Sequence, residues 1–376
     1  MCYWKSFTIF ALMFIISGLL QAADIRVGLF YGSNVQSVVF SVVEGEYMLS
    51  GDGHQIAVVR KSTMFHIEMS GSGMVVSDTL QSFGTYMKLE FKGVSARNVF
   101  QVKPVYPSLP SKESDDNLTI GMRDRSLQLI NLLDLEKYIP GTVEAEGGSN
   151  AGIEYYKAQA VITRTFAVKN FTRHATQGFN LCDGVHCQAF KGKSHMNRLI
   201  YDAVSQTVSK ILVDETGNPI MTAYHANCGG ITCSASMAWN KDLPYLTSVH
   251  DPFCDGSSQR NWTKSIPLAD WNNYLSQKGI PVGSENLQAI TGAGRQKFLY
   301  PEKQKVSMTL LRDDFKLKSS FFTIEESSGS IILHGHGYGH GVGLCQEGAI
   351  EMAKVGYSCI DILMFYFHGV TLVNRQ

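Results

Sequence analysis

The most regular pattern of apolar and polar positions lies in the middle of the chain. From Ile153 to Phe171, apolar residues recur at roughly helical spacing, so this segment is predicted to be a helix. Lys157 and Arg164 are seven residues apart, and they would project from one face of that helix, two turns from each other. The central segment is therefore expected to be a helix that carries two cations on one side.

Two carboxylates precede this helix. The segment that starts at Tyr138 is expected to begin with a turn and then to present Glu144 and Glu146. A pair of glycines follows, and then an N-cap candidate, Ser149 or Asn150. The pattern predicts a carboxylate in the approach to a helix, with two cations nearby. An ordinary helix start is the alternative, because Glu is common in the first turn, where it complements the helix dipole.

The first part of the chain has a different pattern. Residues 24–107 contain short apolar runs separated by Gly, Asn and Ser turns, which indicates a series of hairpins in a small sheet or barrel. Residues 108–117 combine Pro, Ser and charge without a period, which is typical of a linker or a long loop. The expected class is α+β: a mixed sheet-and-helix domain over 118–376 with an additional β-rich N-terminal region.

The remainder of the chain alternates between helical patterns and a loop-rich region around residues 225–255. The glycines at 335–343 are incompatible with a plain strand and precede a helix. The pattern predicts further helices over about 196–209, 268–277, 347–356 and 361–367, and a final strand over 370–373.

Residues 1–23 differ from everything that follows. Lys5 precedes an apolar run that ends at Ala22 and Ala23, which is the pattern of a secretory signal peptide; an uncleaved anchor is the alternative. No later segment has 18 consecutive apolar residues, so the mature chain is expected to be exported to the periplasm or cell envelope without a membrane span. With 33 basic and 33 acidic residues, nothing in the net charge favours nucleic acid as a partner.

Cysteine and histidine residues gather after the central helix. His174, Cys182, His186 and Cys187 offer two nitrogens and two sulfurs, a set that suits tetrahedral zinc. A Cys182–Cys187 disulfide and free thiols are the alternatives. The mature chain would keep an odd number of cysteines, so at least one lies outside any internal disulfide. One disulfide is expected among Cys228, Cys233 and Cys254.

Three motifs, in order along the chain, carry a resemblance to one family. They are Tyr138-x-x-Gly141 … Glu146 with Lys157-Ala-Gln-Ala160 and Arg164-Thr-Phe-Ala167; Cys182 … His186-Cys187-Gln188-x-Phe190 with His225-Ala-Asn-Cys228-Gly-Gly230; and Gly337-Tyr-Gly-His340-Gly-Val-Gly343-x-x-Gln346. Together they resemble the SpoIID/LytB family of bacterial cell-wall proteins, from about residue 118 to the end. The family's usual Glu-Met-Pro is replaced by Glu146-Gly147-Gly148, and its usual Ser before Gln346 is Cys345.

The resemblance implies a lytic transglycosylase that cleaves peptidoglycan glycan strands, with strands stripped of stem peptides preferred. By motif alignment the catalytic acid is Glu146. Glu144 is its rival, and it would point to the other side if the segment were extended. Lys157 and Arg164 resemble the family's retained cations and are expected to hold substrate oxygens.

The other two motifs supply further expected substrate contacts. His225 and Asn227 belong to a motif that is expected to line the cleft, and Tyr224 could stack on a sugar face. His340 and Gln346 are expected to be polar groups that face the sugar. A phosphate-binding loop is not favoured at the glycines, because no Lys or Ser/Thr follows in the P-loop position.

The resemblance also bears on cofactors and partners. Some members carry zinc where the His174–Cys187 set lies, so a structural zinc is expected there, and none is required for the chemistry. The alternative function is that of an amidase enhancer, which would bind glycan or a cell-wall amidase without catalysis. A secreted zinc hydrolase is disfavoured because no His-Glu-x-x-His arrangement is present.

Overall fold

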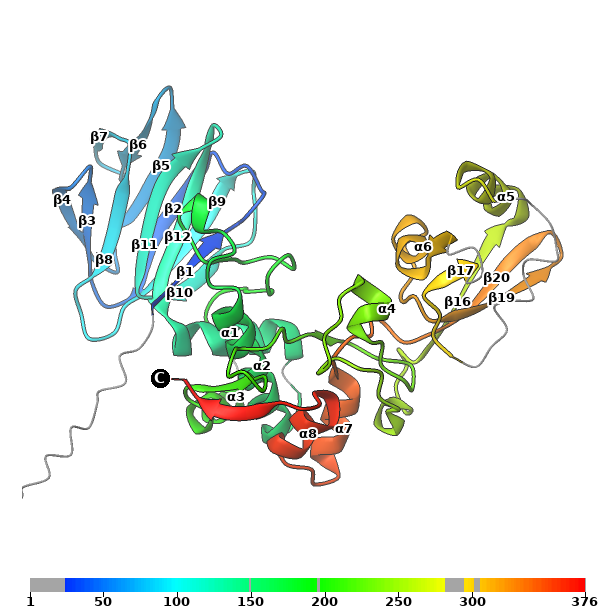
Figure 1. Cartoon of the computed structure of the whole chain (residues 1–376). Coiled ribbons are helices and arrows are strands. Elements are labelled where there is room, and N and C mark those ends of the chain that lie inside the picture. Colours follow the sequence, from blue (N-terminus) through cyan, green and yellow to red (C-terminus); the bar gives the residue numbers. More distant parts are fainter. Residues whose placement is uncertain (1–23, 149, 195–196, 281–293, 301–304, 376) are drawn as a thin grey trace, which may run out of the picture.

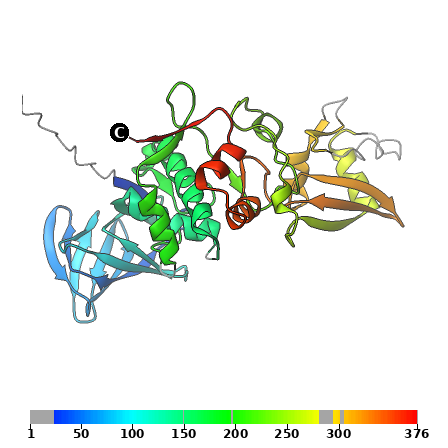
Figure 2. The same ribbon diagram turned by 90° about the horizontal axis from the view of Figure 1, so that it is seen from below.

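The computed structural model describes residues 24–148, 150–194, 197–280, 294–300 and 305–375. The expected signal peptide, Ser149 and Met196 lie outside these ranges. Figures 1 and 2 show three parts in a row: a β-rich part at the N-terminal end, a helical centre, and a smaller sheet with two helices at the far end. The predicted α+β class is confirmed.

The β-rich part consists of two sheets packed face to face. The first sheet has the order β13-β1-β12-β11-β8-β3-β4, and the second has the order β10-β9-β2-β5-β6-β7. The bounds of these strands are β1 Asp24–Leu29, β2 Ser37–Glu44, β3 Tyr47–Gly51, β4 His54–Val59, β5 Met64–Ser70, β6 Gly73–Ser77, β7 Ser82–Tyr86, β8 Leu89–Gly93, β9 Val99–Tyr106, β10 Lys112–Asp115, β11 Asn117–Arg123, β12 Ser126–Asp134 and β13 Leu181–Cys182.

Alternating burial along these strands produces the core between the sheets. In β12, every second residue from Leu127 to Leu133 faces the interior. Phe40 of the second sheet stacks on Phe91 of the first, with ring centroids 3.8 Å apart, and both side chains are fully buried. Aromatic burial of this kind stabilises each sheet against the other.

Residues 108–117, expected to be a linker or a long loop, contain strand β10 and the start of β11. β10 pairs with β9, and β11 pairs with β8, so the β-rich unit continues without a break to Asp134. The charged residues of this segment form ion pairs with a later loop: Lys112 lies 2.7 Å from Asp183, and Asp115 lies 2.6 Å from Lys193. The polar composition reflects these contacts.

Helix α1, Leu135–Gly147, replaces the turn expected at Tyr138. The side chain of Asp134 caps its N-terminus by accepting from the Glu136 N–H. Pro140 and Gly141 suggested a turn, but the helix contains both. The backbone carbonyl of Gly192 packs so closely on Gly141 that a Cβ at this position would clash. Glycine is therefore needed here for packing rather than for a turn.

The predicted central helix is confirmed as α2, Ile153–Lys169. Its N-cap is Gly152, one turn away from the expected cap at Ser149 or Asn150. It is buried on several sides because it contacts α1, α3 Arg198–Gln206, α7 Gln346–Lys354 and α8 Cys359–Tyr366. β14 Lys210–Val213 pairs with the C-terminal strand β22 Thr371–Asn374 beside it.

The smaller sheet at the far end has a core of its own. Antiparallel strands β16, β20 and β19 form the sheet, and buried Trp262, Trp271 and Leu333 belong to its core. The elements here are β16 Asn261–Pro267, α5 Leu268–Gln277, β17 Phe298–Tyr300, β18 Lys305–Ser307, α6 Met308–Asp314, β19 Phe322–Ser327 and β20 Ser330–His336. Among the described helices, none is long and apolar enough to cross a bilayer.

Candidate active site

A cleft of about 600 Å³ opens in the helical centre, beside the end of α1. Glu146 and Gln188 lie on one side of it, and Tyr224, Trp239 and His340 come from later segments of the chain. The later segments are held together by β15 Tyr224–His225, which pairs with β21 Leu344–Cys345. The cleft therefore gathers residues from all three sequence motifs.

Glu146 lies in the last turn of α1 and faces this cleft. Its Oε1 accepts a 2.5 Å hydrogen bond from the backbone N–H of Ala189, and the hydroxyl of Tyr224 is a second partner of the carboxyl. The Gln346 side-chain amide donates to the backbone carbonyl of Glu146 at 2.9 Å. Both the carboxyl group and its backbone are thus held by segments that are distant in sequence.

Burial raises the pKa of Glu146 above its ordinary value of 4.5. The hydrogen bonds from Ala189 and Tyr224, and the charge of Lys191, oppose this effect but are weaker. Glu146 lies at the C-terminal end of α1 and not at a helix start, and the helix dipole there also disfavours the negative charge. The environment thus favours the protonated acid.

Glu144 occupies a different face of α1. Residues two positions apart on a helix are separated by about 200° around its axis, so the side chains of Glu144 and Glu146 diverge. Glu144 does not line the cleft. Among the described residues that line it, Glu146 is the only carboxylate.

The two expected substrate cations on α2 have other partners. Arg164 is fully buried and forms a two-pronged ion pair with Glu136, at 2.6 and 2.8 Å. Lys157 lies 2.6 Å from Glu154 on the same helix. Neither lines the cleft. Both side chains are therefore engaged by carboxylates of the protein itself.

His225 and Asn227 lie behind the cleft surface. His225 is buried, and its Nδ1 lies 3.1 Å from the carbonyl oxygen of Val342. The Asn227 side chain donates to Glu347 at 2.5 Å and accepts from the Gly229 N–H at 2.7 Å. These contacts fix the two loops against each other, so the structure places both residues away from the cleft lining.

Tyr224, His340 and Gln346 lie close to the carboxyl group or its helix. Tyr224 and His340 line the cleft, and Gln346 contacts the backbone of Glu146. Burial lowers the pKa of His340 to about 4, so its imidazole is neutral at neutral pH. Trp239 packs beside His340, with ring centroids 5.3 Å apart, and it offers an aromatic face to the cleft.

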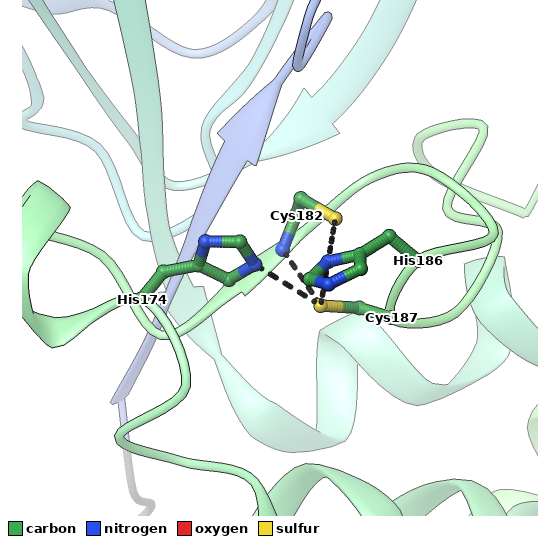
Figure 3. A group of neighbouring side chains, drawn as sticks. All are labelled: His174, Cys182, His186 and Cys187. Atoms are coloured by element: carbon green, nitrogen blue, oxygen red, sulfur yellow. Dashed lines mark hydrogen bonds between the residues drawn. The ribbon is translucent and has the colours of Figure 1, made fainter.

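The predicted Cys/His set is assembled at the edge of this cleft (Figure 3). The ligand atoms of His174, Cys182, His186 and Cys187 all lie within 4.8 Å of one another. The Cys187 sulfur is 3.4 Å from His174 Nε2 and 3.8 Å from His186 Nδ1, and the Cys182 sulfur is 3.7 Å from His186 Nδ1. A hydrogen bond from the Cys187 thiol lowers the pKa of Cys182, which favours a thiolate there.

The seven described cysteines are all free thiols. The disulfide expected among Cys228, Cys233 and Cys254 is therefore not formed in this structure. The sulfurs of Cys228 and Cys254 are 3.4 Å apart, whereas the sulfur of Cys233 lies outside that group.

Two cations that line the cleft were not singled out from the sequence. Arg173 and Lys241 are both exposed, and neither forms an ion pair within the part of the chain that the structure describes. Arg173 directly precedes the metal candidate His174, and Lys241 follows α4 Ala235–Trp239. Neither residue belongs to a periodic pattern. The only indication in the sequence was that Arg173 lies next to the metal candidate His174.

Comparisons with known proteins show which family this chain resembles. The family model of SpoIID, described as "Stage II sporulation protein", matches residues 123–213. The chain is 30% identical over 264 residues to Stage II sporulation protein D of Bacillus subtilis, which covers 65% of this chain and 76% of that relative. It is 31% identical over 253 residues to an uncharacterized protein of Brachyspira hyodysenteriae, with 65% and 68% covered.

A more distant relative is the Amidase enhancer of Bacillus subtilis, which is 25% identical over 291 residues, with 63% of this chain and 40% of that protein covered. Residues 123–213, which the family model matches, contain Glu146 and the Cys/His set. The chain belongs to the SpoIID/LytB family.

Proposed function

We propose that this protein is a peptidoglycan lytic transglycosylase that acts in cell-wall remodelling. It cleaves the bond between N-acetylmuramic acid and N-acetylglucosamine and leaves a 1,6-anhydro end on the muramic sugar. Glu146 is the catalytic acid. Family membership and the position of Glu146 in the cleft support this proposal.

A single carboxyl group can carry out both halves of this reaction. Glu146 protonates the glycosidic oxygen as its bond to muramic C1 breaks. The resulting carboxylate takes the proton of the muramic C6 hydroxyl as that oxygen bonds to C1. One proton moves from the C6 oxygen to the leaving oxygen, and no water is consumed. Proton transfer by one positioned carboxyl group typically contributes about 10²–10⁴ in rate.

The observation that carries the proposal is the lone, partly buried carboxyl group. Glycosidases that use water or a covalent intermediate need two carboxylates flanking the scissile bond. The described lining of the cleft offers only Glu146, which suits an internal hydroxyl as the nucleophile. The raised pKa of Glu146 suits its role as the acid.

The free cations of the cleft support a preference for strands without stem peptides. Removing the peptide leaves a carboxylate on the muramic lactyl group. Arg173 and Lys241 line the cleft and have no ion-pair partner among the described residues, so either can receive that carboxylate. We assign the substrate-contacting role expected of Lys157 and Arg164 to these two residues, together with Tyr224, Trp239 and His340.

We propose that zinc binds His174, Cys182, His186 and Cys187. For zinc bonds of about 2.3 Å to sulfur and 2.0–2.1 Å to nitrogen, a tetrahedron has ligand–ligand edges of about 3.4–3.8 Å. The nitrogen–sulfur distances here, between 3.4 and 3.8 Å, fit those edges. With four protein ligands the ion would be structural, and it would shape the loop that holds Ala189 against Glu146.

A non-catalytic role as an amidase enhancer is the second candidate, favoured by the relative of that name. In that case the cleft would bind glycan strands, or the protein would bind a cell-wall amidase, without cleavage. In either role we place the protein outside the cytoplasm, in the periplasm or cell envelope, as its N-terminal sequence indicates.

The test is to incubate the purified chain with peptide-stripped glycan strands and to analyse the products by mass spectrometry. We expect fragments with 1,6-anhydro-muramic ends. Strands that are bound but remain uncut would contradict the enzyme proposal and support the enhancer. Reducing ends in place of anhydro ends would identify a hydrolase instead.

A further inference from the structure

A second group of metal-ligating side chains lies deeper in the molecule, apart from the set at the cleft edge. Cys228, Asp251, Cys254 and Cys345 place their ligand atoms within 4.8 Å of one another. They come from the loop after β15, from the 3₁₀ turn η2 Pro252–Cys254 with its capping residue, and from β21. All four residues are buried, with Cys228, Asp251 and Cys345 fully so.

The distances in this group suit ligands around one ion better than a disulfide. The sulfurs of Cys228 and Cys254 are 3.4 Å apart, whereas a disulfide bond is about 2.05 Å long. The Cys228 sulfur is also 3.2 Å from Asp251 Oδ2. Three sulfurs share the site, so a disulfide between any two of them would leave the third thiol beside the buried carboxylate.

The Asp251 carboxyl group is fully buried among the thiols, where a bound cation would stabilise its charged form. Desolvating a carboxylate is costly unless a positive charge or several hydrogen bonds compensate for it. The Tyr366 hydroxyl donates to its Oδ2 at 2.9 Å, and the Phe253 N–H donates to its Oδ1 at 3.0 Å. These two contacts orient the carboxylate toward the sulfurs, as outer partners orient metal ligands.

The surroundings also carry positive charge. The Arg295 guanidinium donates to the carbonyl of Cys228 at 2.7 Å and to that of Ile231 at 2.9 Å. Its Nη1 is buried and has no hydrogen-bond partner in the described structure. A guanidinium beside the thiols would offset part of the charge of three thiolates and one carboxylate around a divalent ion.

We propose that Cys228, Cys254, Cys345 and Asp251 form a second structural site for zinc. Three thiolates and one carboxylate oxygen complete a tetrahedron, and they leave no open position for catalysis. A metal ion at this site would affect the cleft by fixing the position of neighbouring residues. Cys345 directly precedes Gln346, whose amide holds the backbone carbonyl of Glu146. The ion would therefore fix the start of α7 against the end of α1, whatever reaction the cleft performs.

The test compares zinc content per chain in full-length protein purified without chelators. Cys345→Ser should lower the zinc content by one equivalent relative to wild type, and Cys187→Ser should lower it by a separate equivalent. Cys359→Ser is the matched control, because Cys359 is a buried thiol in α8 that belongs to neither group, and it should change nothing. Equal zinc in wild type and Cys345→Ser would overturn the proposal.

A second measurement leaves the residues of the second site unchanged, so it does not depend on whether a variant of that site folds. X-ray absorption of zinc-loaded Cys187→Ser protein should show three sulfur neighbours and one oxygen neighbour around the remaining metal. Fewer than three sulfurs, or a Cys228–Cys254 disulfide in non-reducing peptide maps of the loaded protein, would refute the second site. The His174–Cys187 set is already disabled in this variant. Whether that set binds zinc in the wild type therefore does not affect either refuting outcome.

Discussion

Two walls of the cleft hold Glu146 from opposite directions, and they do so differently. The first wall, residues 171–193, contributes the Ala189 N–H, which binds the carboxylate itself. The second wall, residues 221–254 with 337–346, contributes Gln346, which binds the backbone carbonyl. The first wall therefore acts on the charge of the acid, whereas the second wall acts on its position through Gln346 and on its charge through the Tyr224 hydroxyl.

The walls also differ in how they are supported. The first wall is tied to the β-rich part through ion pairs of Lys112 with Asp183 and of Lys193 with Asp115. The second wall is supported from within by β15, β21 and the buried cysteine group. The β-rich part thus braces the loop whose Ala189 N–H donates to the Glu146 carboxyl group.

The largest expected effect comes from removing the acid that both walls hold. Glu146→Gln should lower kcat on peptide-stripped strands by about 10²–10⁴, because the amide cannot donate and then accept the proton. Rates of anhydro-end formation measure this loss. Glu144→Gln, two residues earlier on α1, is the matched control and should retain activity; the opposite ranking would assign the role to Glu144.

Disabling the proposed zinc site of the first wall should have the next largest effect. Cys187→Ser should reduce activity by about 10–100-fold, since the loop that carries Ala189 would lose its anchor. Losing the Ala189 hydrogen bond should also raise the pKa of Glu146 further, because that bond stabilises the charged form. Activity and its pH profile are the measurements, and an unaltered rate in protein shown to lack this zinc would contradict the account.

Removing the Gln346 contact of the second wall should lower the rate less than the two changes above, and it should leave the pH profile unchanged. Gln346→Ala removes one hydrogen bond to a backbone carbonyl, which is worth about 0.5–1.5 kcal/mol, so kcat/KM should fall by about 2–12-fold. Lys354→Ala at the exposed end of α7 is the control. A clear shift of the pH limb in Gln346→Ala would show that the Gln346 contact also controls the charge of Glu146, and would contradict its assignment as a purely positional contact.

The smallest change in rate is expected for Tyr224→Phe, and here the direction of the pH shift matters. The Tyr224 hydroxyl stabilises the Glu146 carboxylate, so its loss should raise the pKa of that carboxyl group. A general acid works while protonated, so activity falls as pH rises through this pKa. The falling limb of kcat/KM should therefore move to higher pH, whereas movement to lower pH would contradict the assignment.

Local patterns predicted much of this architecture. The periodicity of the central segment gave α2, and the short apolar runs gave the β-rich part. The spacing of cysteines and histidines indicated one metal-ligating set, because its members lie close together in the sequence. In each case the signal and the structure depend on residues within a few positions of one another.

Contacts between distant segments could not be predicted in this way. A turn was expected where helix α1 contains Gly141. The glycine is needed there because the backbone carbonyl of Gly192, distant in sequence, packs against it. Arg164 was expected to hold substrate oxygens. Its actual partner, Glu136, lies 28 residues earlier, so no local pattern pointed to that ion pair. The buried cysteine group unites Cys228 with Cys345, 117 residues apart, and no local spacing reveals it.

Digesting peptide-stripped strands in ¹⁸O-labelled water and measuring the mass of the new ends tests whether one carboxyl group is sufficient for this cleavage. We expect anhydro-muramic ends without label, since the C6 oxygen of the sugar itself closes on C1 and Glu146 moves only a proton. New reducing ends that carry ¹⁸O would show that water attacks C1, and would contradict this expectation.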